Sequence, residues 1–125
     1  MPFSDLMGVE VTERAKERVR GRMTVREDLC TAGGILHGGA FMALADALGA
    51  IGAVMNLPQG ARTTTLESKT NFLRGAPVGS IVEAEATPLH VGRRSSVWQT
   101  RITDAEGKLL CLVTQTQMTI LPESA

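Results

Sequence analysis

The sequence contains few cysteines and few aromatic residues. Of its 125 residues, two are cysteines, 3% are aromatic and none is a tyrosine. Cys30 and Cys111 lie far apart in the chain, without the Cys-x-x-Cys or Cys/His spacing that is typical of a zinc site. We interpret both as reduced thiols of a cytoplasmic protein, because disulfides are rare in that compartment. A nucleophilic Cys30 is the alternative, and it would need a base beside it.

The sequence also has no excess of positive or of negative charge. Thirteen basic residues balance thirteen acidic ones, which argues against bulk attraction to nucleic acid or to a membrane surface. The first residues, MPFSDLMGVEV, lack a basic segment followed by an apolar one, so the sequence predicts no secretion signal. The longest apolar stretch, 38–57, is interrupted by Asp46 and is rich in small residues, which favours a core helix over a membrane span.

The length and the apolar pattern predict a single α+β domain over residues 1–125. Period-two alternation over 8–27 is typical of two half-buried strands. From 38 to 57 the apolar residues recur every three or four positions, which predicts one long helix. A domain this small often gains stability by association, so we expect more than one subunit. Further strands are predicted over 63–73, 82–87, 97–103 and 108–121, and one face of the last is expected to carry Leu110, Leu112, Thr114, Thr116 and Met118.

Asp46 is unusual because it is the one charged residue of an otherwise apolar helical stretch. Burying a carboxylate is costly unless the group is paired or used in chemistry. Asp46 is therefore a candidate functional residue. The alternative is that it simply points into solvent, as most aspartates do.

A second unusual feature is the sequence His37-Gly38-Gly39 at the start of the same helix. The first turn of a helix presents unpaired N–H groups and the positive end of the helix dipole. Glycine lets a substrate oxygen approach these N–H groups closely, and such a helix end can stabilise an oxyanion. Asp46 lies more than two turns further on, so both features can border one groove only if a substrate spans it or a partner subunit completes it.

Two segments carry a resemblance to a known family. LHGGAFMALAD resembles the PaaI-like branch of the hotdog-fold acyl-CoA thioesterases. PLHVGRRSSVWQ is similar to the 1,4-dihydroxy-2-naphthoyl-CoA hydrolases and to the proofreading thioesterases of enterobactin synthesis. The resemblance runs from about Leu6 to Leu121, and it implies a hotdog fold, in which a curved antiparallel sheet wraps one long helix. It also implies a homodimer at least, and a homotetramer as the expected assembly, with the sites at the dimer interface.

The resemblance implies a catalytic role for five residues. Asp46 takes the position of the family's acid, as nucleophile or as base for water, and Gly38 takes that of the oxyanion donor, supported by His37. A hydroxyl that comes from the other subunit's strand in some relatives falls near Thr64 or Thr65. Thr31 occupies a position where many relatives have Asn or Gln to polarise the thioester carbonyl, and its shorter side chain is a departure from that pattern. The acid on the helix is a second departure. The enterobactin-type relatives commonly have Glu where this chain has Asp46, as the PaaI-like branch does, so the chain combines features of both branches.

The resemblance also implies residues that bind the substrate. His90 falls beside the acyl or pantetheine pocket, together with Gly92. The CoA phosphates would be met by Arg74, Arg93 and Arg94, and Thr64 would lie nearby. The alternatives are that His90 only bonds the backbone, that Arg93 and Arg94 form a solvated turn, and that the threonines near 64 are only β-branched strand residues.

We therefore expect an acyl-CoA thioesterase that hydrolyses an aryl- or a medium- to long-chain acyl-CoA, without a metal or cofactor. A hotdog enoyl-CoA hydratase or dehydratase is a second possibility, because the fold alone does not distinguish the two reactions. A non-catalytic acyl-CoA-binding protein is the third. Such a sensor would need an output module, and the sequence leaves no residues for one.

Overall fold

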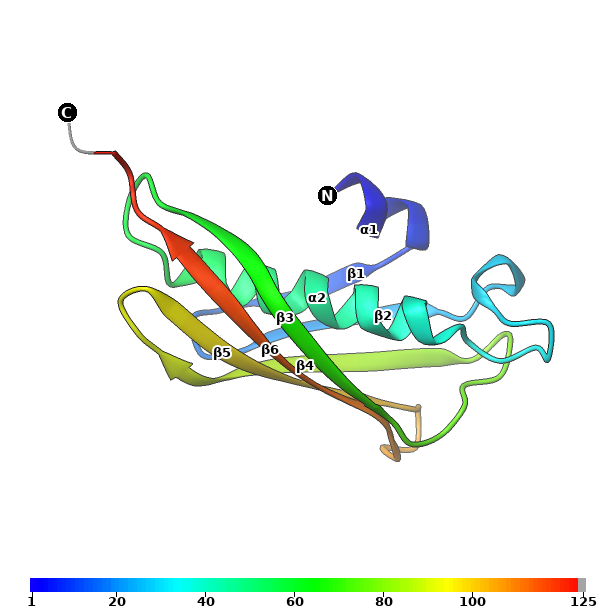
Figure 1. Ribbon diagram of the computed structural model, residues 1–125. Helices are drawn as coiled ribbons and strands as arrows, with labels where there is room; N and C mark the ends of the chain where they lie inside the picture. Colours follow the sequence, from blue (N-terminus) through cyan, green and yellow to red (C-terminus); the bar gives the residue numbers. More distant parts are fainter. Residues whose placement is uncertain (124–125) are drawn as a thin grey trace.

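The computed structural model describes residues 1–123 and has one long helix lying across a curved six-stranded antiparallel sheet (Figure 1). This arrangement confirms the predicted α+β hotdog fold. The strand order across the sheet is β1-β2-β4-β5-β6-β3. The helices are α1 (Pro2–Met7) and α2 (Gly38–Met55), and the strands are β1 (Glu10–Arg14), β2 (Val19–Thr24), β3 (Arg62–Phe72), β4 (Ile81–Val91), β5 (Ser95–Thr103) and β6 (Leu109–Ile120).

The sequence did not predict α1 or the 3-10 turn at Glu27–Leu29. Helix α1 has six residues, begins with proline and ends at Gly8, which adopts a φ of 81°. Phe3 and Leu6 of this helix are exposed and only Met7 is buried. A helix this short shows no apolar periodicity, so its sequence resembles a loop.

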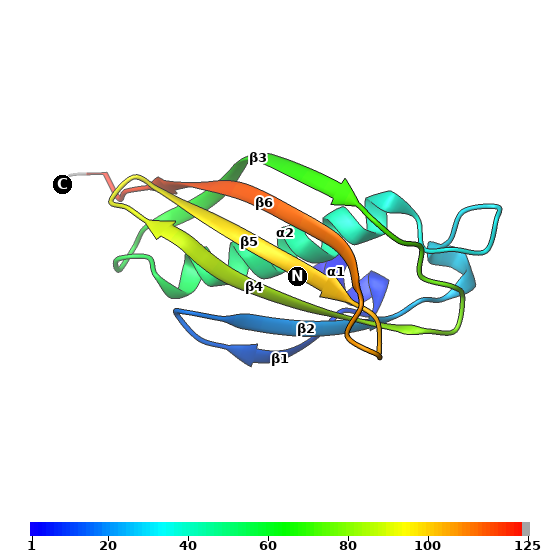
Figure 2. The same cartoon turned by 90° about the horizontal axis from the view of Figure 1, so that it is seen from below.

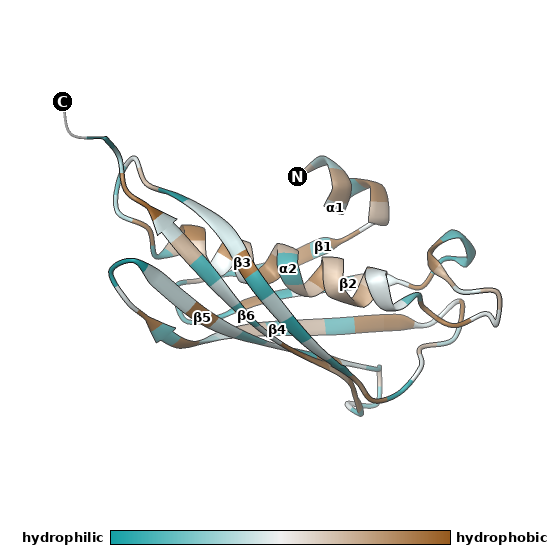
Figure 3. Cartoon of the chain, in the orientation of Figure 1, coloured by the Kyte–Doolittle hydropathy of each residue, from teal (hydrophilic) through white to brown (hydrophobic). Residues whose placement is uncertain are grey.

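Helix α2 packs closely against the sheet because small residues line it. A Cβ added at Gly49 would lie 2.4 Å from the side-chain amide of Gln115, and one added at Gly52 would lie 2.5 Å from the ring of Trp98. Figure 3 shows α2 mainly in the colours of hydrophobic residues. By length and composition the helix could cross a membrane, but in this structure it forms the core against the sheet, as predicted.

The inward faces of the strands complete this core. Residues of β2 alternate between buried and exposed, and the buried members include Val19 and Met23. Trp98 of β5 is fully buried and donates its indole N–H to Ser96 Oγ at 3.0 Å. The sheet curves around one side of α2, as the view from below shows (Figure 2).

The residues predicted to share one face of the last strand do so from Leu112 to Met118, and this is the less buried face of β6. Val113, Gln115 and Gln117 are buried, whereas Met118, which was expected on the opposite face from them, is exposed. Leu110 was predicted to lie on the same face but is buried, because the pairing of β5 with β6 shifts register near Leu109. Two polar glutamines, which the sequence analysis did not single out, occupy the inner face near Asp46.

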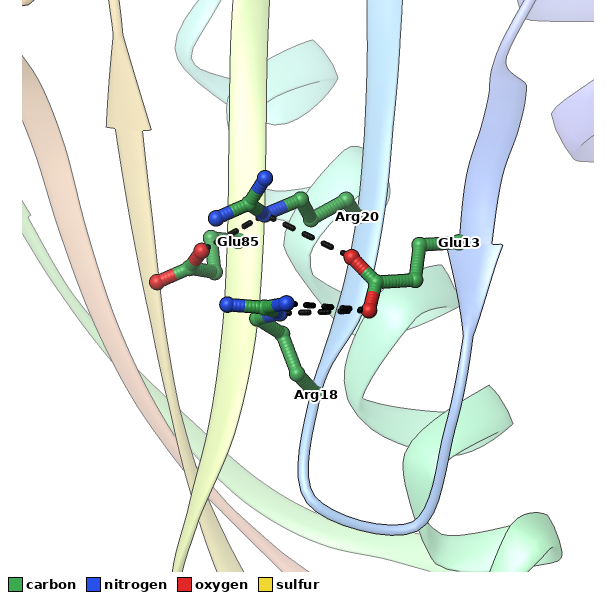
Figure 4. Close-up of polar contacts among 4 residues, drawn as sticks. All are labelled: Glu13, Arg18, Arg20 and Glu85. Atoms are coloured by element: carbon green, nitrogen blue, oxygen red, sulfur yellow. Dashed lines mark hydrogen bonds and ion pairs between the residues drawn. The ribbon is translucent and has the colours of Figure 1, made fainter.

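Ion pairs on the opposite face of the sheet connect the edge strand β1 with β2 and β4. Glu13 lies 3.1 Å from Arg18 and 3.7 Å from Arg20, and Arg20 also contacts Glu85 of β4 at 2.7 Å (Figure 4). The hydrogen bond that Arg18 donates to the Glu13 carboxylate raises the pKa of Arg18 above its ordinary value. All four side chains are partly exposed to solvent, so each pair contributes little to stability.

The close approach of α2 to Trp98 predicts the sign of one stability change. In an open helix, Gly→Ala stabilises by up to about 1 kcal/mol. Gly52→Ala is expected to destabilise this protein by about 1–3 kcal/mol, because the new methyl group overlaps the buried Trp98 ring. Urea unfolding measures the change. Gly33→Ala is the control, because its Cβ meets only Thr31 Oγ1 at an ordinary 3.7 Å. Equal or greater stability of Gly52→Ala would contradict the packing described here.

Candidate active site

Asp46 lies in the middle of α2 and is held by two side chains from the sheet. Its Oδ1 accepts a hydrogen bond from Thr65 Oγ1 at 2.7 Å and another from Gln115 Nε2 at 3.2 Å. The residue is nevertheless exposed in the single chain. Within residues 1–123 no hydrogen bond reaches Oδ2. The carboxylate is therefore anchored through one oxygen while the other is open to a substrate, and it does more than point into solvent.

The hydroxyl beside Asp46 comes from the same chain. The resemblance placed it on the other subunit, near Thr64 or Thr65. Thr65 pairs with Gln117 on the inner face of the sheet, and its hydroxyl also lies 2.6 Å from Gln117 Oε1. Thr64 is exposed and pairs with the exposed Met118, so strand alternation turns it away from Asp46.

The sequence analysis missed Gln115 and Gln117. Both are buried, and Gln115 Nε2 donates to Gln117 Oε1 at 3.0 Å. Gln117 Nε2 in turn donates to Thr63 Oγ1 at 3.1 Å. The available signal was the alternation Thr-Gln-Thr-Gln at 114–117, which puts two long amide side chains on one face of a strand.

The start of α2 offers an open backbone donor. His37 caps the helix, because its Nδ1 accepts the N–H of Gly39 at 2.8 Å. The His37 carbonyl accepts the N–H of Ala40 at 2.9 Å. In the part of the chain that the structure describes, the N–H of Gly38 has no hydrogen-bond partner. His37 therefore fixes the turn from which the Gly38 N–H points, at the positive end of the helix dipole.

Two cavities flank this helix start. One, of about 350 Å³, is lined by Gly38 together with Thr31, Phe41, Phe72 and Arg74 among others. The structure thus brings Thr31 and Arg74, two predicted site residues, together with Gly38.

The second cavity, of about 360 Å³, lies on the other side of His37 and has a mainly apolar lining. Phe3, Leu6 and Met7 of α1 form part of its wall, together with Cys30. The Cys30 thiol donates to the carbonyl of Arg26 at 3.2 Å. The described residues show no hydrogen bond between Cys30 and His37, so the geometry does not favour a nucleophilic cysteine.

The remaining predicted residues lie at the other end of the helix. Gly92 and Arg93 line a cavity of about 450 Å³ with Ala53 and Asn56, at the C-terminal end of α2. His90 is exposed at the end of β4, and a Cβ at Gly92 would lie 2.7 Å from its Nε2. Arg94 follows in the same β4–β5 turn. The 18 residues of α2, a length of about 27 Å, separate this group from Gly38 within one chain.

Gly38 and Asp46 are also separated within one chain. Asp46 follows Gly38 by eight positions in a continuous helix, and a rise of 1.5 Å per residue puts them about 12 Å apart along its axis. A reacting carbonyl must lie about 3 Å from its oxyanion donor and a similar distance from its nucleophile. These two groups of the same chain therefore cannot act on one carbonyl.

Comparisons with known proteins show the family and support the fold. The model of a family described as the thioesterase superfamily matches residues 33–111. The 1,4-dihydroxy-2-naphthoyl-CoA hydrolase of Listeria monocytogenes is 31% identical to the chain over 90% of each protein. A crystal structure of a Haemophilus influenzae thioesterase has 31% identity and a TM-score of 0.89, covering 94% of this chain and 82% of the other. The Escherichia coli PaaI structure has a TM-score of 0.90 over 98% of this chain and 86% of the other; at 21% identity it shows the fold alone.

Proposed function

The chain belongs to the thioesterase superfamily and is a thioester hydrolase, and we propose that it hydrolyses acyl-CoA at a site shared between two copies of the chain. Gly38 of one copy binds the carbonyl oxygen, and Asp46 of the other provides the reactive carboxylate. One observation carries this proposal. Among the described residues the Gly38 N–H and the Asp46 Oδ2 both lack a hydrogen-bond partner, and the two residues lie about 12 Å apart along the helix of one chain.

A second copy has suitable surfaces to complete the site. Gly39, Met42 and Asp46 are exposed along one side of the N-terminal half of α2. Strand β3 is an 11-residue edge strand with nothing paired to its outer side among the described strands, and such edges pair readily with another chain. Two helices running in opposite directions would bring each Gly38 toward the other copy's Asp46. The assembly is then a homodimer at least, and we expect two such dimers to form a homotetramer.

The reaction follows from these groups. The Gly38 N–H takes the charge that develops on the carbonyl oxygen, and no reorganisation is needed because His37 already fixes the turn. In one route Asp46 removes a proton from water, the resulting hydroxide adds to the carbonyl carbon, and the C–S bond then breaks. The proton passes from Asp46 to the departing CoA thiolate. In the other route Asp46 attacks the carbon directly and displaces the CoA thiolate, which takes up a proton. Water then attacks the Asp46 carbonyl carbon of the acyl-enzyme anhydride, which releases the free acid and regenerates the Asp46 carboxylate. Single-turnover hydrolysis in oxygen-18 water separates the two, because only the second labels the protein.

The cavities support an apolar acyl group, aryl or alkyl. The walls that flank the helix start include Phe3, Leu6 and Met7 on one side and Phe41 and Phe72 on the other. We expect benzoyl- and decanoyl-CoA to be hydrolysed with a higher kcat/KM than malonyl-CoA, whose charged acyl group would be desolvated in such a pocket. The CoA phosphates would be met by Arg74, Arg93 and Arg94, with His90 and Gly92 beside the bound substrate. Thr64 is turned away from Asp46 and is not expected to contact the substrate.

Gly38→Pro isolates the role of the backbone donor. Proline has no N–H and is well accepted at the first helical position, and the extended His37 backbone (φ −62°, ψ 138°) suits a following proline. We expect kcat for benzoyl-CoA to fall by about 10²–10³. Gly38→Ala is the matched control: it keeps the N–H and places the same Cβ against Phe72 at 3.1 Å. A similar loss in both variants would show that the crowding, rather than the N–H, is responsible.

Asp46→Asn tests the carboxylate. The change keeps the size and the contact with Thr65 but removes the base or nucleophile, so thiol release is expected to fall by about 10²–10⁴. Asp104→Asn, in the distant β5–β6 hairpin, is the control and should keep its activity. Near-normal turnover by Asp46→Asn would contradict the proposal. Hydration of an enoyl-CoA without thiol release would instead support the hydratase alternative.

Mixed assemblies test whether the site is shared. Co-expression of Asp46→Asn with Gly38→Pro should restore activity, because a mixed dimer has one doubly defective site and one intact site. Random pairing predicts recovery of about a quarter of the wild-type activity. Each variant alone is the control. No recovery, with mixed dimers shown to be present by mass spectrometry, would place both groups in one chain's site.

A further inference from the structure

Gln115 is a buried amide whose orientation is set by Asp46. Its Nε2 faces two acceptors, Asp46 Oδ1 at 3.2 Å and Gln117 Oε1 at 3.0 Å. The two N–H groups of the amide match these two oxygens. The opposite orientation would turn Gln115 Oε1 toward the carboxylate, so two oxygens would face each other without a proton.

This orientation of the Gln115 amide leaves its buried oxygen unsatisfied. Within residues 1–123 the buried Gln115 Oε1 has no hydrogen-bond partner, and an unsatisfied buried carbonyl typically costs about 1–3 kcal/mol. Gly49, one turn beyond Asp46, leaves room for this amide, since any Cβ there would overlap it. Unsatisfied polar groups in native structures often mark functional sites.

The Thr65 hydroxyl has two acceptors but one proton. It lies 2.7 Å from Asp46 Oδ1 and 2.6 Å from Gln117 Oε1. Gln117 cannot turn its amide N–H toward Thr65, because its Oε1 is held by Gln115 and its Nε2 by Thr63. When Asp46 is ionised, Thr65 can therefore donate to only one of the two oxygens. When Asp46 is protonated on Oδ1, it donates to Thr65, and Thr65 donates to Gln117.

We propose that Gln115 and Gln117 are positioning residues that act on Asp46 in opposite directions. Gln115 donates to Oδ1 and so stabilises the ionised carboxylate. Gln117 draws the Thr65 proton away from Asp46, so the carboxylate keeps its ability to accept a proton or attack carbon. Together they tie Oδ1 to the sheet and leave Oδ2 as the reactive oxygen. The catalytic consequence rests on the proposed function; the effect on the titration of Asp46 does not.

Few other charges act on Asp46 from the elements packed around it. It is the only charged residue of α2. The inward residues near it on β3 are Thr63, Thr65 and Ser68, and those on β5 are Ser96, Trp98 and Thr100, none of which is charged. The inward titratable group of β6 is Cys111, and burial raises the pKa of its thiol to about 11. In a dimer, His37 of the second copy would also face Asp46.

The test measures the titration of Asp46 directly. In the full-length protein, the carboxyl ¹³C resonance of Asp46 is assigned by its absence in Asp46→Asn and followed against pH. Gln115→Met removes the donor, so the titration midpoint is expected to move to higher pH. Gln117→Met frees Thr65 to donate to Asp46, so the midpoint is expected to move to lower pH. One hydrogen bond of ordinary strength corresponds to a shift of about half to one pH unit in each case.

Controls separate this role from a general effect on packing. In a Thr65→Val background, Gln117→Met should no longer move the midpoint, whereas Thr65→Ser keeps the hydroxyl and should restore the shift. If a methionine variant does not fold, Gln→Asn at the same position shortens the amide and is expected to give the same sign. Midpoints that move in the same direction, or that do not move, would overturn the proposal.

The activity profile distinguishes this proposal from the proposed function. The acid limb of kcat/KM for benzoyl-CoA should move with the NMR midpoint in each glutamine variant. Opposite NMR shifts without any hydrolysis in the wild type would support the positioning role and contradict the thioesterase reaction. Hydrolysis by the wild type together with titration midpoints that do not move in the variants would support the thioesterase reaction and contradict the positioning role.

Discussion

The fixed rise of one straight helix is the constraint on which the site depends. Gly38 and Asp46 belong to the same uninterrupted helix, so no rotamer or loop movement can bring them to one substrate atom. In the proposed site, a single chain therefore presents the Gly38 donor and the Asp46 carboxylate too far apart to act together. In the proposed dimer, two copies in opposite orientation form two complete sites. In this account, association contributes directly to the chemistry as well as to the stability of a small domain.

The helix can carry such a site because the sheet holds it closely. Gly49 and Gly52 let Gln115 and Trp98 approach the backbone of α2, and these contacts set the helix's rotation against the sheet. That rotation turns Asp46 toward β3 and β6, where Thr65 and Gln115 meet its Oδ1. A rigid core and a buried, partly unsatisfied amide thus fix one oxygen of a carboxylate that remains open on its other side.

Local sequence patterns predicted α2 and the strands and singled out Asp46 as a candidate, because apolar periodicity and one charge in an apolar helix are visible in the chain itself. Gln115 and Gln117 were missed because hydrophobicity was the guide to the core, and both are polar residues buried on the inner face of β6. The contact between Thr65 and Asp46 depends on the pairing of β3 with β6 and on the register shift after Thr65, which no local pattern reveals. Helix α1 was not predicted because a helix of six residues is too short to show an apolar periodicity.

The most direct test of the shared site is a crystal structure with an acyl-CoA analogue that has a methylene group between its carbonyl and its sulfur. Such a compound keeps the carbonyl but cannot be hydrolysed. The account predicts a carbonyl oxygen about 3 Å from the Gly38 nitrogen of one chain, with Asp46 of a second chain facing the carbonyl carbon. A carbonyl bound at Gly38 with no carboxylate from a second chain beside it would contradict the account.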